Sequence, residues 1–178
     1  MNTLATIRAI YRYPVKGLSA QPLATAALTP GETLTGDRRY AIENGPSGFN
    51  PAMPQYLPKQ RFLMLMKNER LARLETHFDD AEQTLRIREN GTEVARGDLR
   101  TPSGCAAIEQ FFARYCADEL RGSPKVLAAP GHSFSDVARK VVSIINLTSV
   151  AAVEELVGHP VDPLRFRGNL YVEGWPPW

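Results

Sequence analysis

The chain has 178 residues, 43% hydrophobic and 22% charged, so it can bury the core of one domain or of two small ones. Its 21 basic and 19 acidic residues give a formal net charge of +2 and include no polybasic run, so bulk charge offers no argument for nucleic-acid binding. No segment has the apolar length that a bilayer-spanning helix needs, and residues 1–14 carry Arg8 and Arg12. We therefore expect a cytoplasmic protein with no nucleic-acid partner and no membrane association.

The two cysteines agree with a reducing compartment. Cys105 and Cys116 are eleven residues apart. In a helix this spacing separates their Cα atoms by about 16 Å, which is too far for a disulfide. We expect two buried thiols, as in most intracellular proteins.

The first part of the chain predicts short strands joined by turns. Residues 4–13 alternate loosely between polar and apolar, as a half-buried strand does, and further strands are expected at residues 23–28 and 38–43, where turn signals separate them. Residues 44–59 contain four prolines and two glycines. A loop of that length is either functional or a disordered insertion.

The middle of the chain predicts more strands and then a helix. Residues 71–78, 84–88 and 92–95 have strand character, and the Asn90-Gly91 pair between the last two is a strong hairpin signal. After Thr101 and Pro102, which mark a helix start, apolar residues recur at steps of three and four. This apolar face consists of Cys105, Ile108, Phe111, Phe112, Tyr115 and Cys116.

The last part of the chain adds short elements. Strands are expected at residues 125–128, 141–145 and 170–173, with a loop at 130–136 that is a candidate for a binding site. Thr148 is expected to cap a helix that runs through residue 157. The whole pattern, without internal repeats, predicts a strand-rich α+β fold that is barrel-like.

Several kinds of active site are disfavoured by the residues themselves. The three histidines are isolated from one another and from both cysteines, so we predict no metal ligands. No glycine-rich phosphate loop or nucleophile elbow is present. Asp79 and Asp80 adjoin one another between two predicted strands, where a solvated turn is the simplest interpretation.

Basic and amide side chains remain as candidates because they lie at the ends of predicted elements, where binding groups are usually carried. They are Lys16, Arg38, Arg165, Arg167 and Asn169. A guanidinium offers a planar fork to phosphate, an ammonium offers a point charge, and an Asn amide both donates to and accepts from a heterocycle. Such a set would suit a phosphorylated heterocycle. Taken singly, each is also consistent with a solvated surface residue.

All five of these positions fall within three segments that resemble the motifs of a known family. Residues 13–17 (YPVKG) are similar to the family's YPVKS, residues 36–40 (GDRRY) to its GDR-x-W/Y, and residues 165–169 (RFRGN) to its RFRPN. The family contains proteins with a MOSC N-terminal β-barrel domain followed by a MOSC domain. Residues 134–136 (FSD) and 143–156 also resemble the family pattern, so the likeness spans essentially the whole chain.

The resemblance implies a division into an N-terminal β-barrel domain at residues 1–98 and the beginning of a MOSC domain at residues 99–178. The family includes the mitochondrial amidoxime-reducing component, bacterial reductases of N-hydroxylated compounds and the C-terminal region of molybdenum cofactor sulfurases. All of them handle molybdopterin, and pyridoxal phosphate binding is also ascribed to the family. The resemblance therefore implies molybdenum cofactor binding.

The same resemblance implies roles for five residues. Lys16 and Arg38 would hold the terminal phosphate of the cofactor, and Arg167 and Asn169 would bond its pyranopterin or its phosphate. Ser149, with Thr148 and Asn146 beside it, is either a further cofactor contact or an ordinary residue of the first helical turn.

Two departures from the family pattern matter. Gly17 and Gly168 replace the usual Ser and Pro of the motifs. Family members also continue, beyond the position of Trp178, with further strands and a cysteine that ligates molybdenum. Neither Cys105 nor Cys116 takes that place, so we expect a C-terminally truncated and catalytically inert chain without metal ligands.

Two functions follow from the resemblance. One is an oxidoreductase that reduces N-hydroxylated compounds with electrons from a redox partner protein. The alternative is a noncatalytic module that binds or carries molybdopterin or sulfur. Because an incomplete barrel exposes unpaired backbone groups at residues 170–178, we also expect either a homodimer or disorder near these residues.

Overall fold

The computed structural model describes residues 4–178, which form two compact units. The first unit contains residues 4–12, 22–36 and 140–178, and the second contains residues 13–21 and 37–139. Each unit is therefore assembled from separate stretches of chain. The domain division after residue 98 stays a prediction.

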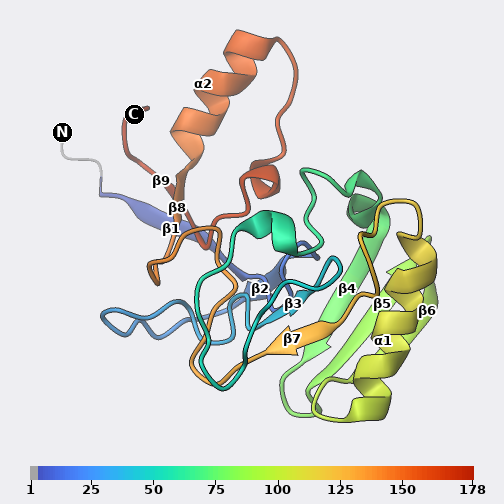
Figure 1. The fold of residues 1–178 in the computed structure, drawn as a ribbon. Coiled ribbons are helices and arrows are strands. Elements are labelled where there is room, and N and C mark those ends of the chain that lie inside the picture. Colours follow the sequence, from blue (N-terminus) through green and yellow to red (C-terminus); the bar gives the residue numbers. More distant parts are fainter. Residues whose placement is uncertain (1–3) are drawn as a thin grey trace. The chain divides into compact units, whose positions relative to one another are not determined.

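A four-stranded sheet with the strand order β2-β1-β9-β8 runs through the first unit (Figure 1). Its strands are β1 (Thr6–Arg12), β2 (Gln21–Leu23), β8 (Ile144–Asn146) and β9 (Leu170–Glu173). β1 pairs antiparallel with β9, with Ile10 opposite Leu170, and β8 runs parallel to β9. The strand predicted at residues 170–173 is confirmed.

Helix α2 (Leu147–Val157) begins directly after β8. The Asn146 side chain caps it, because its Oδ1 accepts a hydrogen bond from the Thr148 N–H at 3.2 Å. The prediction that Thr148 caps this helix is therefore wrong by two residues. Gly158 ends the helix in the left-handed conformation, with φ 72°, and the short 3-10 helix η3 (Pro163–Phe166) leads on to β9.

A three-stranded antiparallel sheet and one helix make up much of the second unit (Figure 1). The elements are β4 (Leu74–Asp79), β5 (Thr84–Glu89), β6 (Thr92–Asp98) and α1 (Pro102–Tyr115). As predicted, Thr101 begins the helix: its Oγ1 accepts a hydrogen bond from the Gly104 N–H at 3.0 Å. Helix α1 comes very close to β6, since a Cβ added to Gly97 would lie 2.2 Å from the Gly104 carbonyl oxygen.

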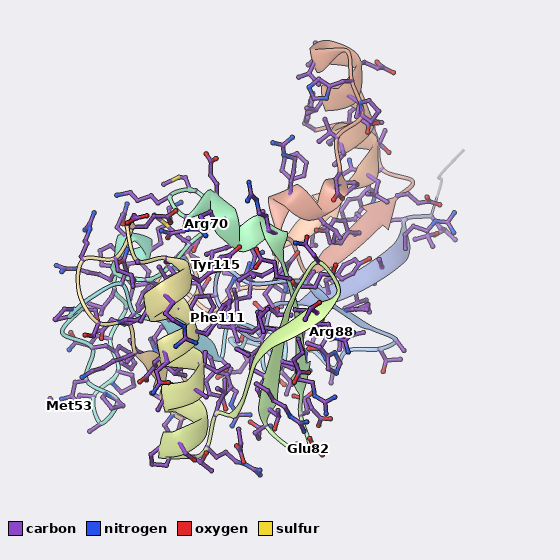
Figure 2. The ribbon with its side chains drawn as sticks, turned by 90° about the vertical axis from the view of Figure 1, so that its right-hand side faces the viewer. Met53, Arg70, Glu82, Arg88, Phe111 and Tyr115 are labelled. Atoms are coloured by element: carbon purple, nitrogen blue, oxygen red, sulfur yellow. The ribbon has the colours of Figure 1, made fainter. Side chains whose placement is uncertain are left out.

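The apolar face of α1 packs into the core of the second unit. Ile108, Phe112 and Cys116 are fully buried, as predicted, whereas Cys105 is only half-buried because it lies near the start of the helix. Figure 2 shows Phe111 and Tyr115 on α1, and their rings stack with centroids 5.2 Å apart. The Arg70 guanidinium covers the Tyr115 ring at 4.7 Å.

A second, two-stranded sheet completes this unit. It pairs β3 (Tyr40–Ile42) antiparallel with β7 (Val126–Ala128), and β3 is entirely buried. Two 3-10 helices, η1 (Lys59–Arg61) and η2 (Glu69–Arg73), lie between β3 and β4. The strand predicted from residue 71 begins only at Leu74, because the Leu71 N–H closes a turn onto the Asn68 carbonyl oxygen at 3.0 Å.

The predicted strand-rich α+β fold is confirmed, but within residues 4–178 the sheets do not close into a barrel. The strands separate into sheets of four, two and three strands because β1 pairs with β9, and β3 pairs with β7. The strand predicted at residues 23–28 is limited to β2, since most of the following side chains are exposed and unsuited to a packed sheet. Among the described residues, no helix combines the length and apolar character needed to cross a bilayer.

Candidate functional site

Two of the sequence motifs lie side by side in the second unit. The Arg38 N–H donates to the Tyr13 carbonyl oxygen at 2.7 Å, and the Tyr40 N–H donates to that of Pro14 at 3.0 Å. The Lys16 N–H returns a bond to the Tyr40 carbonyl oxygen at 2.8 Å. These backbone bonds hold residues 13–17 against residues 37–40, and thereby fix the positions from which Lys16 and Arg38 extend.

A third segment, residues 133–136, packs against both motifs. The Phe134 N–H donates to the Arg38 carbonyl oxygen at 2.8 Å, and the Ser133 hydroxyl donates to the Asp37 carbonyl oxygen at 3.1 Å. The Lys16 ammonium donates to the Phe134 carbonyl oxygen at 2.9 Å. Three segments that are far apart in the sequence thus converge around two basic side chains.

Lys16 is the most buried cation of this cluster. Only 4% of its side chain is exposed, and its ammonium forms an ion pair with the Asp136 carboxylate, which is 60% exposed. Burial raises the pKa of Asp136, but the hydrogen bond and charge of Lys16, together with the charges of Lys59 and Arg38, outweigh this and lower it. Asp136 is therefore ionised at neutral pH, and it neutralises Lys16.

Arg38 is held in a different way. Its backbone is left-handed, with φ 50°, and its guanidinium pairs with the adjacent Asp37 carboxylate and lies 4.9 Å from the centroid of the Tyr13 ring. Asp37 is buried and also accepts a hydrogen bond from the Tyr13 N–H at 2.8 Å. The Asp37 carboxylate is therefore held in position by burial and by two partners, whereas the Asp136 side chain is mostly exposed to solvent.

The proline-rich loop packs onto the same segment, so the alternative of a disordered insertion is wrong. The centroid of the Phe49 ring lies 5.3 Å from that of the His132 ring and 5.0 Å from that of the Phe134 ring. The Tyr56 hydroxyl donates to the Asp136 carbonyl oxygen at 3.1 Å. This long loop is therefore ordered by contacts with the residues that surround Lys16.

Two glycines that depart from the family motifs have local structural reasons. Gly17 is in the left-handed conformation, with φ 80°, and an added Cβ would lie 2.8 Å from the Leu63 carbonyl oxygen. At Gly168 an added Cβ would lie 2.2 Å from Cγ1 of Ile145. In this chain neither position has room for the side chain that is usual in the family.

The other predicted site residues belong to the first unit, where Asn169 is almost fully buried. Its Oδ1 accepts hydrogen bonds from the Ser143 N–H at 3.1 Å and the Ser143 hydroxyl at 3.0 Å, and its Nδ2 donates to the Tyr11 carbonyl oxygen at 3.1 Å. The amide therefore links β1 to the chain that precedes β8 and β9. One N–H of the Asn169 amide is not used by these three bonds.

Arg167 and Ser149 lie elsewhere in the first unit. Arg167 follows η3 in the left-handed conformation, with φ 54°, while Arg165 is exposed. The Ser149 hydroxyl accepts a hydrogen bond from the Trp178 N–H at 3.1 Å and lines a mainly apolar pocket of about 290 Å³. The structure brings Lys16 and Arg38 together, and the convergence of Ser149, Arg167 and Asn169 with them stays a prediction.

The two thiols and the acidic turn at Asp79 have ordinary structural environments. Cys105 and Cys116 are free, and burial raises the pKa of the Cys116 thiol to about 11 and also raises that of Cys105. Asp79 accepts hydrogen bonds from the Ala81 and Glu82 N–H groups, which confirms the predicted turn. Within residues 4–178, no three His, Cys, Asp or Glu side chains form a cluster that suits a metal ion.

Sequence reasoning overlooked Asp37 and Asp136 as the partners of the two cations. Both were visible as acidic residues inside or beside motif segments, residues 36–40 and 134–136. Their pairing with Arg38 and Lys16 depends on contacts that only the folded chain shows.

Comparison with known proteins gives one match. Residues 4–121 match the sequence model of the MOSC N-terminal beta barrel domain. This range includes Lys16, Arg38 and the proline-rich loop, and it ends before Asp136. No curated protein and no solved structure matches the chain.

Proposed function

The chain belongs to the family of proteins with a MOSC N-terminal beta barrel domain, and from this we propose that it binds the molybdenum cofactor, molybdopterin, through the terminal phosphate of the cofactor. The observation that carries the proposal is the convergence of Lys16 and Arg38. They come from separate motifs, and the main chain around them is tied together by hydrogen bonds of 2.7 to 3.0 Å.

The two cations suit a phosphate by their chemistry. The Lys16 ammonium supplies a buried point charge, and the Arg38 guanidinium supplies a planar fork of donors. Each is already paired with carboxylate oxygen, from Asp136 and Asp37 respectively. Phosphate oxygens make the same kind of charge-assisted hydrogen bond, so the site fits the anionic end of the cofactor.

In the first unit, Arg167, Asn169 and Ser149 are proposed to contact the pyranopterin or the phosphate. Asn169 would act mainly by positioning the strands, because most of its hydrogen-bonding capacity is used within the protein. Its remaining N–H is the group that it can offer to a ligand.

When bound, the cofactor would supply redox chemistry at molybdenum, and the chain would bind it, orient it and limit its exposure to water. We propose that the chain takes part in the reduction of N-hydroxylated compounds, with electrons from a redox partner protein. We further propose that two copies of the chain form a homodimer. Burial raises the pKa of both thiols, so both stay protonated at neutral pH in the chain without a bound metal.

The alternative is a noncatalytic module that binds molybdopterin. The raised thiol pKa values favour this over a sulfur carrier, since sulfur transfer needs a reactive thiolate. Both proposals share the same phosphate site and are separated by turnover of an N-hydroxylated substrate.

The experiment is to express the chain in a host that makes the cofactor and to measure the pterin retained after purification. We expect pterin in the wild-type protein and much less in Lys16→Gln and Arg38→Gln. Equal pterin in all three proteins would contradict the proposal. Pyridoxal phosphate content, measured in the same samples, tests whether another phosphorylated heterocycle occupies the site.

A further inference from the structure

We infer that Asp136 is an internal competitor for the anion site, whose carboxylate occupies the place of a ligand oxygen at Lys16 and must leave when phosphate binds. This inference rests on the proposed function, because it concerns the same site. Asp136 would then determine which anions the site binds.

The two partners of Lys16 differ in how firmly they are held. The Phe134 residue is buried, and its N–H is bonded to the Arg38 carbonyl oxygen at 2.8 Å, so the carbonyl oxygen that holds Lys16 is fixed. The Asp136 side chain is 60% exposed and belongs to a stretch without helix or strand. The carboxylate can therefore turn into solvent while the buried ammonium keeps its place.

The charges around Asp136 would act on a bound phosphate as well. Lys16, Lys59 and Arg38 all stabilise the charged form of Asp136. A phosphate placed beside Lys16 would experience the same three cations. It would also lie next to the Asp136 carboxylate, and two anions without a shared proton repel one another. Phosphate and the Asp136 carboxylate therefore exclude each other from this position.

Competition by Asp136 would affect both the affinity and the selectivity of the anion site. If phosphate can bind only while the Asp136 side chain is turned away from Lys16, the apparent affinity for phosphate falls in proportion to the fraction of molecules in that state. A multiply charged anion gains more from the three cations than a monocarboxylate does, and so displaces Asp136 more readily. A neutral ligand gains nothing that would replace the ion pair. Binding sites often gain specificity in this way, because a penalty against the wrong ligand separates it from the right one.

The Tyr56 hydroxyl supports this arrangement from the proline-rich loop. It bonds to the main-chain oxygen of Asp136 at 3.1 Å, rather than to its carboxylate. The backbone of the segment is thereby held while the acidic side chain remains able to rotate. The loop thus holds the competitor close to Lys16 without fixing its side chain.

The test measures binding of a phosphate monoester, phenyl phosphate, to the full chain by calorimetry at pH 8, where the ester carries no proton to share with Asp136. We expect Asp136→Asn and Asp136→Ser to bind the ester more tightly than wild type, on the order of tenfold, which corresponds to the loss of one competing charged contact. The exposed Asp118, which follows α1, provides the control, because Asp118→Asn makes the same change in net charge and should leave the affinity unchanged. Thermal unfolding shows whether each variant is folded.

The outcomes separate this inference from the proposed function. Tighter binding in both Asp136 variants, abolished when Lys16→Gln is added, supports the inference. Unchanged or weaker binding in the Asp136 variants, with binding still dependent on Lys16, would overturn the inference and leave the phosphate site intact. Phosphate binding that is unaffected by Lys16→Gln in the wild-type background would overturn both.

Discussion

The ammonium of Lys16 donates a hydrogen bond of 2.9 Å to the main-chain oxygen of Phe134, although the two residues are 118 positions apart in the sequence. This bond joins the opening motif to the segment that resembles another part of the family pattern. A buried charge is tolerated where hydrogen-bond acceptors compensate for its lost hydration. The relationship explains how the chain keeps a cation in its interior at the position proposed for phosphate.

Replacing Arg38 tests the second cation. We expect Arg38→Ala to weaken phosphate binding by about 1.5–3 kcal/mol, because a charge-assisted contact is lost. Calorimetric titration with phosphate measures the change. The adjacent Arg39 is exposed, and its guanidinium lies 5.4 Å from the Tyr40 ring centroid, so Arg39→Ala is a matched control. Equal losses in the two variants would show that only general charge matters.

Asn169 should matter for stability whether or not a ligand is present. Asn169→Ala leaves the Ser143 and Tyr11 backbone groups without their partner, and we expect the free energy of unfolding to fall by about 2–3 kcal/mol. Urea unfolding monitors the change. Gln55→Ala, which shortens an exposed side chain of the proline-rich loop, should cost less than about 0.5 kcal/mol. If the two variants are equally stable, the structural role given to Asn169 is wrong.

The close approach of α1 and β6 predicts a cost for a single methyl group. An added Cβ at Gly104 would lie 2.1 Å from the Asp98 carbonyl oxygen, so Gly104→Ala should destabilise the protein by about 1–3 kcal/mol despite the better helix propensity of Ala. Gln110→Ala, on the exposed side of the same helix, serves as the control. Stabilisation by Gly104→Ala in urea unfolding would refute the packing described here.

The cap of α2 can be tested with two neighbouring residues. Asn146→Ala should lower the free energy of unfolding by about 1 kcal/mol, because it removes the acceptor for the Thr148 N–H. Thr148→Ala should have a smaller effect, since the Thr148 side chain is not the cap. A larger loss in Thr148→Ala would restore the assignment made from the sequence.

Cys116 should make stability depend on alkaline pH. Burial, with a smaller contribution from Glu119, raises the thiol pKa to about 11, so the folded protein holds a proton that the unfolded chain loses at lower pH. The protonated thiol therefore makes its full contribution to the free energy of unfolding at pH values below its pKa in the unfolded chain. This contribution, at most about 3 kcal/mol, is lost as the pH rises through its pKa in the folded protein. Urea unfolding between neutral pH and pH 11 should show a steeper loss in wild type than in Cys116→Ala. Parallel curves would contradict the assignment.

Local patterns predicted those elements whose partners are close in sequence. The Asn90-Gly91 hairpin and the helix after Thr101 follow from turn and capping chemistry, and both are present. The pairing of β1 with β9 connects the two ends of the described chain, and no periodicity within either strand specifies its partner. The barrel-like expectation failed for this reason.

The candidate site shows the same limit. Lys16 and Arg38 were identified from motifs, but the ion pair between Lys16 and Asp136 depends on the fold around Phe134. Asn169 was expected as a ligand group, and its buried bonds to Ser143 are a structural use that the motif does not reveal.

Amide chemical shifts recorded during a phosphate titration test the central claim most directly. If phosphate binds at Lys16 and Arg38, the amides of residues 13–17, 37–40 and 133–136 should shift together and saturate with one dissociation constant. The same titration of Lys16→Gln should lose these shifts while its spectrum remains that of a folded protein. Shifts that are absent, or scattered over exposed basic residues without saturation, would contradict phosphate binding at this site.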